Sequence, residues 1–230
     1  MSNYKALVLR MRSDFAHWRN PFSLSILETF LMPQKTSVLG ILGAMCGLIE
    51  RDVEKLGERL KVSIKLEKLR GIVLDLVTLY NLKEKGLKTP IVRQLLFKVS
   101  YTFIILGPTN LMNDLLFKIE DGEGFPIYAG VSEMLAEARV DCEIEDVKIQ
   151  KGRGEFFNVS LPYFSRPYEW KVGNPNELIV PPRVVKKTLL FRNGRKEKEF
   201  IDILEGYNIK IKPSWEIEYV VYNDELFPVF

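Results

Sequence analysis

The stretch FAHWRNPFSLSILETFLMPQKTSVLGILGAMCGL, residues 15–48, leads from the end of a predicted strand through an aromatic and basic loop into an apolar helix. Lys35, Thr36 and Ser37 stand where this helix is expected to begin, and either hydroxyl can cap it. A helix start presents N–H groups and the positive end of the helix dipole to an anion. We therefore expect a phosphate site where the first strand meets the first helix; the alternative is a simple cap that is satisfied internally.

The loop before this helix carries His17, Trp18, Arg19 and Asn20, followed by Pro21. Aromatic rings and a guanidinium plane suit unstacked bases, and an arginine can clamp a phosphate. The alternatives are structural: a surface salt bridge for Arg19 and a core position for Trp18, since large aromatic side chains are usually buried. We expect these four residues to contact nucleic acid.

Length and composition limit the possible classes of protein. The chain has 230 residues, and its 33 basic and 30 acidic side chains leave a net charge of +3, which excludes a uniformly basic surface but permits a local basic patch. The N-terminal residues show no signal-peptide pattern and the apolar runs are too short to span a membrane, so we expect a cytoplasmic protein without membrane contact. Cys46 and Cys142 are expected to be free thiols, and without a CxxC pair we expect no zinc site.

Hydrophobic periodicity predicts the order strand–helix–strand–strand–helix–strand, which is that of a ferredoxin-like unit of the α+β class. In the first strand, Leu7, Leu9 and Met11 share one face, and Arg10 and Arg12 lie on the other. The predicted strands are residues 4–12, 62–66, 71–80, 94–106 and 140–149. The predicted helices are residues 36–50, 110–120 and 132–138, and residues 51–60 either continue the first helix or form a second one. Residues 81–93 are expected to be a polar loop.

Three glycines recur inside the first predicted helix. Gly40, Gly43 and Gly47 are spaced by three and four residues, so they fall on one helical face and would let the helix approach a sheet closely. The order G-x-G-x-x-G is absent, so we do not expect a dinucleotide site.

The last third of the chain is rich in predicted strands. Asn193–Gly194 is typical of a two-residue hairpin turn, and a second hairpin is expected around Pro213. We therefore expect a ferredoxin-like domain over residues 1–150 and a β-rich, hairpin-containing extension over residues 151–230 that packs on it.

Four motifs occur in a recognisable order along the chain. They are FAHWRNP at residues 15–21, PQKTSVLGILG at 33–43, RQLLFKVSYTFIIL at 93–106 and FPIYAGVSEMLAEA at 125–138. Together they resemble the fifth CRISPR-associated (Cas) subunit family, a branch of the RAMP (repeat-associated mysterious protein) superfamily. The resemblance covers about the first 140 residues.

This resemblance implies a ferredoxin-like, RRM-related fold with a β-hairpin extension. It implies a non-catalytic, RNA-binding role in antiviral defence, because members of the family cap the 5′ handle of the crRNA in type I Cascade surveillance complexes. The implied partners are the crRNA 5′ handle, the Cascade backbone subunit and the large subunit, with no small-molecule cofactor.

A second RNA contact is expected at residues 151–154 (KGRG), where glycines loosen a basic loop around Lys151 and Arg153. RAMP proteins often carry a glycine-rich loop in their second half; the alternative is a basic turn. The cations beside the Asn193–Gly194 turn are more typical of a solvated hairpin tip. They are Arg192, Arg195, Lys196 and Lys198.

Whether the protein is a ribonuclease depends on His17, the only histidine in the sequence. Metal-free ribonuclease chemistry needs a base and an acid, and one branch of the resembled family uses a tyrosine, a lysine and a histidine. Lys35 or Tyr101 could join His17 here, although neither position matches that motif. Asp14 and Asp75 stand alone, so we expect no metal site. We expect no catalysis; the alternative is a metal-independent endoribonuclease that processes CRISPR repeat RNA.

Overall fold

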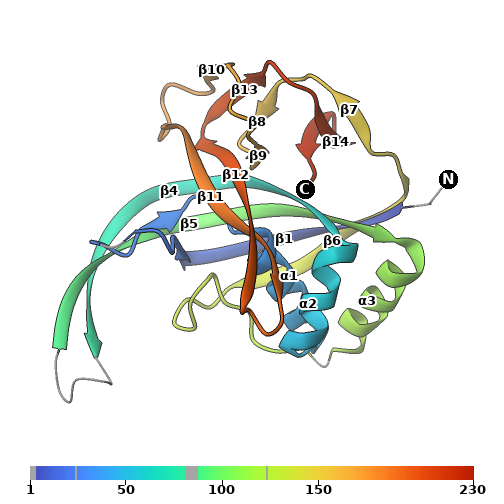
Figure 1. Cartoon of the computed structure of the whole chain (residues 1–230), viewed down its shortest axis with the longest axis horizontal. Coiled ribbons are helices and arrows are strands. Elements are labelled where there is room, and N and C mark those ends of the chain that lie inside the picture. Colours follow the sequence, from blue (N-terminus) through green and yellow to red (C-terminus); the bar gives the residue numbers. More distant parts are fainter. Residues whose placement is uncertain (1–3, 24, 81–87, 123) are drawn as a thin grey trace.

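The computed structural model describes residues 4–23, 25–80, 88–122 and 124–230. Its base is an antiparallel sheet with the strand order β4-β5-β1-β6, and the helices cover one face (Figure 1). This is the strand order of a ferredoxin-like unit, so the predicted fold class is confirmed. The strands of this sheet are β1 (Tyr4–Ala16), β4 (Lys61–Tyr80), β5 (Lys88–Pro108) and β6 (Glu137–Val147). The helices are α1 (Lys35–Met45), α2 (Glu50–Arg59) and α3 (Thr109–Asp121). A separate short pair is formed by β2 (Trp18–Arg19) and β3 (Thr29–Phe30).

Alternation along β1 decides which side chains enter which core. Leu7 and Leu9 are fully buried in the main core on the helix side of the sheet. Ala6 and Val8 face the other way and are covered by the C-terminal strands, with Phe227 among their neighbours. Arg10 and Arg12 continue this second face, as predicted, where the cover ends.

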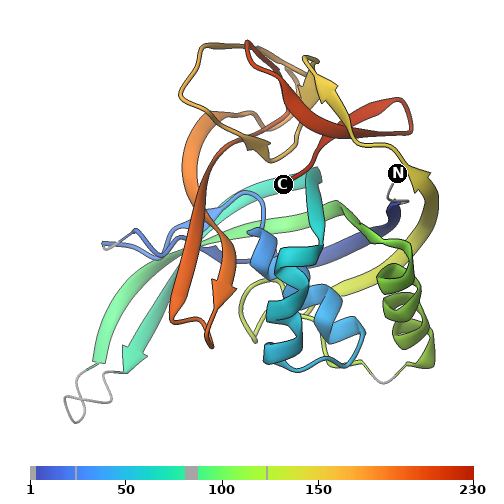
Figure 2. The same cartoon turned by 45° about the vertical axis from the view of Figure 1, so that its right-hand side comes forward.

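The β-rich remainder of the chain packs above the sheet and around its β4 edge (Figure 1). One hairpin, β11–β12, passes the edge and reaches the helices (Figure 2). The strands of the whole β-rich remainder are β7 (Gln150–Gly152), β8 (Phe156–Phe157), β9 (Leu161–Pro162), β10 (Tyr168–Val172), β11 (Val180–Arg192), β12 (Glu197–Tyr207), β13 (Ile209–Pro213), β14 (Ile217–Tyr222) and β15 (Glu225–Pro228).

Strands β4 and β5 continue together beyond the body as a two-stranded arm (Figures 1 and 2). The separate strands predicted at 62–66 and 71–80 are one strand, with an irregularity between Leu66 and Lys68. The loop predicted at 81–93 is wrong for 88–93, which belong to β5 because β4 supplies their hydrogen-bonding partners; 81–87 lie outside the described residues.

Helix α1 starts one residue before the predicted cap. Gln34 occupies the N-cap with an extended backbone and no side-chain cap, so capping by Thr36 or Ser37 is wrong. Residues 51–59 lie in the separate helix α2, which follows a turn at Gly47. Gly43 faces Val53 of α2 rather than the sheet, whereas a Cβ on Gly40 would meet nothing within 4 Å.

The helix predicted at 132–138 is wrong. The backbone of residues 127–136 closes a tight loop, in which the Ala129 N–H donates to Met134 O and the Ala136 N–H donates to Ile127 O, and β6 begins at Glu137. Gly130, with φ of 96°, sits against the backbone carbonyl of His17, a position that a side chain would block.

The predicted hairpins are partly correct. The hairpin at Asn193–Gly194 forms, but its loop spans four residues because Arg192 pairs with Glu197. The hairpin predicted around Pro213 is wrong, since β13 pairs with β10 and β8 instead. Strand β14 pairs with β15 across Asn223–Asp224, whose positive φ angles suit a tight turn.

A buried ion cluster ties β11 and β12 to the segment before α1. The Glu205 carboxylate, which has no exposed surface, accepts hydrogen bonds from Lys187 Nζ at 2.6 Å and from Arg183 at 2.9 Å. It also accepts the Leu31 N–H at 3.0 Å, and Lys187 donates in addition to Met32 O at 2.9 Å. Lys187 and Arg183 hold the pKa of Glu205 below its usual value against the effect of burial, so the carboxylate stays charged.

We predict that Glu205→Ala lowers the free energy of unfolding by about 3–5 kcal/mol, because it leaves the buried Lys187 ammonium without its counter-ion. Urea unfolding measures the change. Asp202→Asn, on the same strand but partly exposed, is the control and should change stability little. A loss for Glu205→Ala no larger than for the control would contradict this role.

The two helical glycines should respond in opposite ways to alanine. A Cβ at Gly43 would lie 2.3 Å from Val53 Cγ2, so Gly43→Ala should destabilise the α1–α2 contact by about 1–3 kcal/mol. Gly40→Ala should instead stabilise by about 0.5–1 kcal/mol, because its site is open and alanine favours the helix. Thermal unfolding of both variants tests the pair, and equal effects would contradict it.

Candidate nucleic-acid interface

The junction between β1 and β2 buries two of the residues predicted to contact RNA. His17 Nδ1 donates to the backbone carbonyl of Gln94 at 2.9 Å, and burial lowers the pKa of His17. Trp18 Nε1 donates to the Tyr101 hydroxyl at 2.9 Å, which in turn donates to Leu31 O. Trp18 is thus a core residue, which was the structural alternative, and neither ring offers a face to a base.

Arg19 and Asn20 behave differently from their neighbours. The Arg19 side chain is exposed and has no hydrogen-bond or ion-pair partner within the described ranges. Asn20 is occupied, since its Nδ2 donates to Glu28 and its Oδ1 accepts the Phe22 N–H at 3.0 Å. Of the four predicted loop residues, Arg19 alone keeps a free polar group at the surface of this part of the structure.

Lys35 opens α1 in an unusual environment. Its side chain is only 6% exposed, and it has no hydrogen-bond or ion-pair partner among the residues that the structure describes. Burial, with a smaller contribution from Lys61, lowers the pKa of Lys35 from 10.5 to about 8. Thr36 and Ser37 are half-buried on the same turn. A largely buried lysine at a helix start favours an anion beside its ammonium group.

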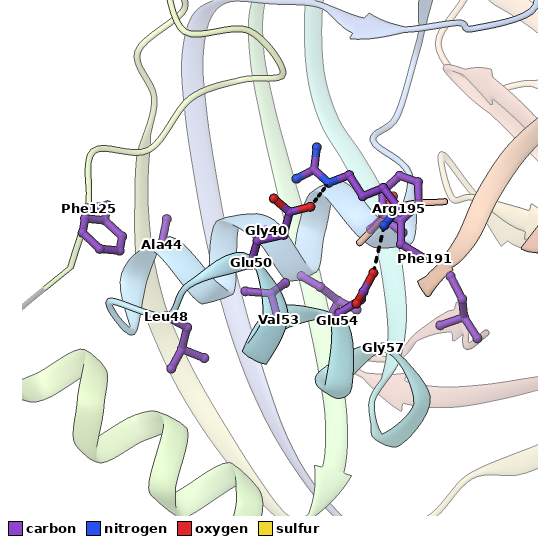
Figure 3. Close-up of a pocket in the computed structure, with 13 residues that line it drawn as sticks. Gly40, Ala44, Leu48, Glu50, Val53, Glu54, Gly57, Phe125, Phe191 and Arg195 are labelled. Carbon is purple, nitrogen blue, oxygen red and sulfur yellow. Dashed lines mark hydrogen bonds and ion pairs between the residues drawn. The ribbon is translucent and has the colours of Figure 1, made fainter. Parts of the chain in front are cut away.

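A pocket of about 250 Å³ lies beside Thr36, between α1, α2 and the tip of the β11–β12 hairpin (Figure 3). Its walls are largely apolar, with Leu48, Val53 and Phe125 among them. The cation at its rim, Arg195, is paired with Glu50 at 2.6 Å. Arg192 is likewise paired, with Glu58 at 2.9 Å. This pocket therefore does not suit a phosphate chain. The tip of the β11–β12 hairpin packs on α2 through the ion pairs of its two arginines.

The basic loop lies far from the strand–helix junction. Lys151, in β7, is exposed and 3.7 Å from Glu216, and Arg153 is exposed just after that strand. Strand β7 follows β6 near the start of β1, whereas Arg19 lies past the end of β1 (Figure 1). The 13 residues of β1 separate the two places by about 40 Å, so they are not one site.

The structure reveals a basic groove on the face of the sheet that the C-terminal strands leave open. Lys68, Ser100 and Arg12 lie opposite one another in one row across β4, β5 and β1. With Lys98 and Asp14 they line a groove of about 820 Å³. Arg12, Lys68 and Lys98 are exposed and make no ion pair within the described chain. Sequence reasoning placed Arg12 on this face but could not align it with lysines from strands 56 and 86 residues away.

The strand order and the helices on one face define this protein as a ferredoxin-like domain with a β-rich extension. The family model described as "CRISPR-associated protein (Cas_Cas5)" matches residues 6–156, so the chain belongs to that family. No curated protein matches it. No helix in the described ranges is long and apolar enough to cross a membrane.

Two solved structures show the same fold at low sequence identity. A chain of a "CRISPR RNA-guided surveillance complex" is 13% identical, with 93% of this chain and 91% of that chain covered and a TM-score of 0.51. A CRISPR protein from Archaeoglobus fulgidus is 12% identical, with 98% of both chains covered and a TM-score of 0.52. The likeness extends into the β-rich region, beyond residue 156, where the family match ends.

The free energy of unfolding of the protein without RNA should depend on pH because Lys35 is buried. Because the pKa of Lys35 is lower in the folded chain than in the unfolded chain, its burial destabilises the fold by about 3 kcal/mol below pH 8, and this cost disappears as pH rises from about 8 to 10.5. Lys35→Met should therefore stabilise most below pH 8 and least near pH 10.5, as measured by urea unfolding. A difference for Lys35→Met that stays constant with pH would contradict the lowered pKa.

Proposed function

We propose that this protein is a non-catalytic, crRNA-binding subunit of a type I CRISPR surveillance complex, where it holds the 5′ handle of the guide RNA and nucleates assembly. The observation that carries the proposal is the groove in which Arg12, Lys68 and Lys98 have no ion-pair partners in the described chain. Spaced, unpaired cations along an open groove are suited to a phosphate backbone. Arg19 and Lys35 add two further cations without partners in the described ranges.

The arm supports the assembly part of the proposal. Leu74 and Leu76 are 70% and 69% exposed, and Ile72 is also exposed, on a two-stranded ribbon that projects from the body. A monomer gains nothing from apolar side chains placed there, whereas a neighbouring subunit would bury them. We assign this surface to contact with the backbone subunit, and propose the large subunit as a second neighbour.

The burial of His17 and Tyr101, two of the three candidate catalytic groups, supports a non-catalytic role. His17 is 2% exposed and its Nδ1 is engaged by Gln94. Tyr101 is fully enclosed, and burial raises the pKa of its hydroxyl above the usual value. A base and an acid that cannot reach the substrate cannot transfer its protons.

Incubation of the chain, alone and with its backbone subunit, with full repeat RNA in EDTA across a salt series tests the proposal. We expect bound and uncut RNA, with affinity falling steeply as salt rises. Cut RNA would contradict the non-catalytic part and favour the endoribonuclease. Absence of binding under both conditions would contradict the RNA-binding role.

Single substitutions in the groove sharpen this test. Arg12→Ala and Lys98→Ala should each weaken binding for any RNA sequence and reduce the slope of log affinity against log salt by about 0.7, the value for one phosphate of a single strand. Lys118→Ala is the control, because this exposed lysine lies on α3, across the sheet from the groove. An equal effect of all three variants would show that general charge, rather than the groove, determines affinity.

A further inference from the structure

Two phenylalanines lie side by side on the two central strands of the sheet. Phe15 in β1 and Phe97 in β5 are paired in register, with ring centroids 5.3 Å apart and an angle of 38° between the rings. Phe15 is 39% exposed and Phe97 is half-buried. Large apolar rings at the centre of a sheet are normally covered, so their exposure calls for an explanation.

The local backbone turns both rings away from the main core. Lys98 has a left-handed backbone with φ of 48°, and the β1–β5 pairing skips Asp14 and Lys98, which interrupts the alternation of side chains. The next pair, Ala16 and Leu96, is fully buried in the helix-side core. The rings therefore point to the opposite side of the sheet from this pair.

The surroundings of the rings leave room and supply positive charge. On the β4 side, Gly71 pairs with Phe97, and a Cβ added to Gly71 would meet nothing within 4 Å. Lys98 Nζ, which also lines the basic groove, lies 5.7 Å from the centroid of the Phe97 ring. The rings thus stand at the edge of the groove with open space beside them.

This combination matches the chemistry of an unpaired nucleotide strand. Bases stack on aromatic faces while cations neutralise the adjoining phosphates. RRM domains, which share the four-stranded ferredoxin-like sheet, place their stacking aromatics on the open face of that sheet. We propose that Phe15 and Phe97 form a stacking platform for two unpaired bases of the RNA whose phosphates contact the groove, an inference that rests on the proposed function.

The platform has a consequence for the choice of substrate. Bases in a duplex are stacked on each other, so their faces are not free to stack on Phe15 and Phe97. Every base has a π-face, so stacking tolerates many sequences. The platform therefore selects a single strand over a duplex rather than one sequence over another.

Affinities of the full chain for a single-stranded RNA carrying the 5′ handle, and for the same RNA annealed to its complement, test the platform. Phe15→Ala and Phe97→Ala should each weaken single-strand binding by at least about fivefold. The salt slope should stay unchanged, because no cation is removed, and binding of the duplex should be unaffected. Phe15→Trp should retain wild-type affinity, and its fluorescence should be quenched on binding.

Phe117→Ala is the matched control, since Phe117 is 69% exposed on α3, on the other side of the sheet, and its loss should leave affinity unchanged. If the wild-type chain binds RNA and the Phe15 and Phe97 variants bind equally well, the platform is wrong while the proposed function stands. If these variants bind RNA normally but fail to join the assembled complex, the rings dock a protein, and the platform is again wrong. If the wild-type chain binds no RNA, the proposed function fails and the platform with it.

Discussion

The buried carboxylate of Glu205 is the interaction on which the relation between the two parts of the chain depends. It lies on β12 of the extension, yet it accepts the Leu31 N–H, in the segment that leads into α1. A charged group without exposed surface is tolerated only when several donors surround it. Arg183, Lys187 and the Leu31 N–H supply these donors. Because Lys187 also donates to Met32 O, displacing the extension would expose the ion cluster and leave the Leu31 N–H and the Met32 carbonyl without these partners.

The same contact sets the position of the first helix. Two residues after Met32 the chain reaches Gln34, whose side-chain oxygen accepts the Thr188 N–H of β11 at 2.6 Å. The residue that could cap α1 is thereby bound to the extension, and Lys35 follows in a site that offers it no partner in the described chain. The lowered pKa of Lys35 reflects this largely buried site, and a bound anion would relieve the cost of burial.

Local patterns predicted much of the fold, and long-range contacts account for what they missed. The alternation in residues 4–12 correctly placed Leu9 and Arg12 on opposite faces, because strand periodicity is a local property. The pattern at residues 88–93 failed because β4 completes that strand. The environment of His17 and Trp18 depends on Gln94 and Tyr101, more than 75 residues away, and no local pattern shows that a loop aromatic will be enclosed. The groove was missed for the same reason, since it unites three strands.

If the chain has the proposed function, the charges in the groove supply only part of its affinity for RNA. Arg12, Lys68 and Lys98 are opposed by Asp14 and Glu137 on the same lining, which leaves a net charge of about +1. Because affinity from counterion release scales with the number of phosphates neutralised, so small an excess supplies only part of the affinity for RNA. Stable retention of RNA then requires a contribution that salt does not screen, such as stacking on exposed rings or enclosure by a neighbouring subunit. A chain with a net charge of +3 and an exposed apolar arm is suited to hold RNA as part of an assembly rather than by itself.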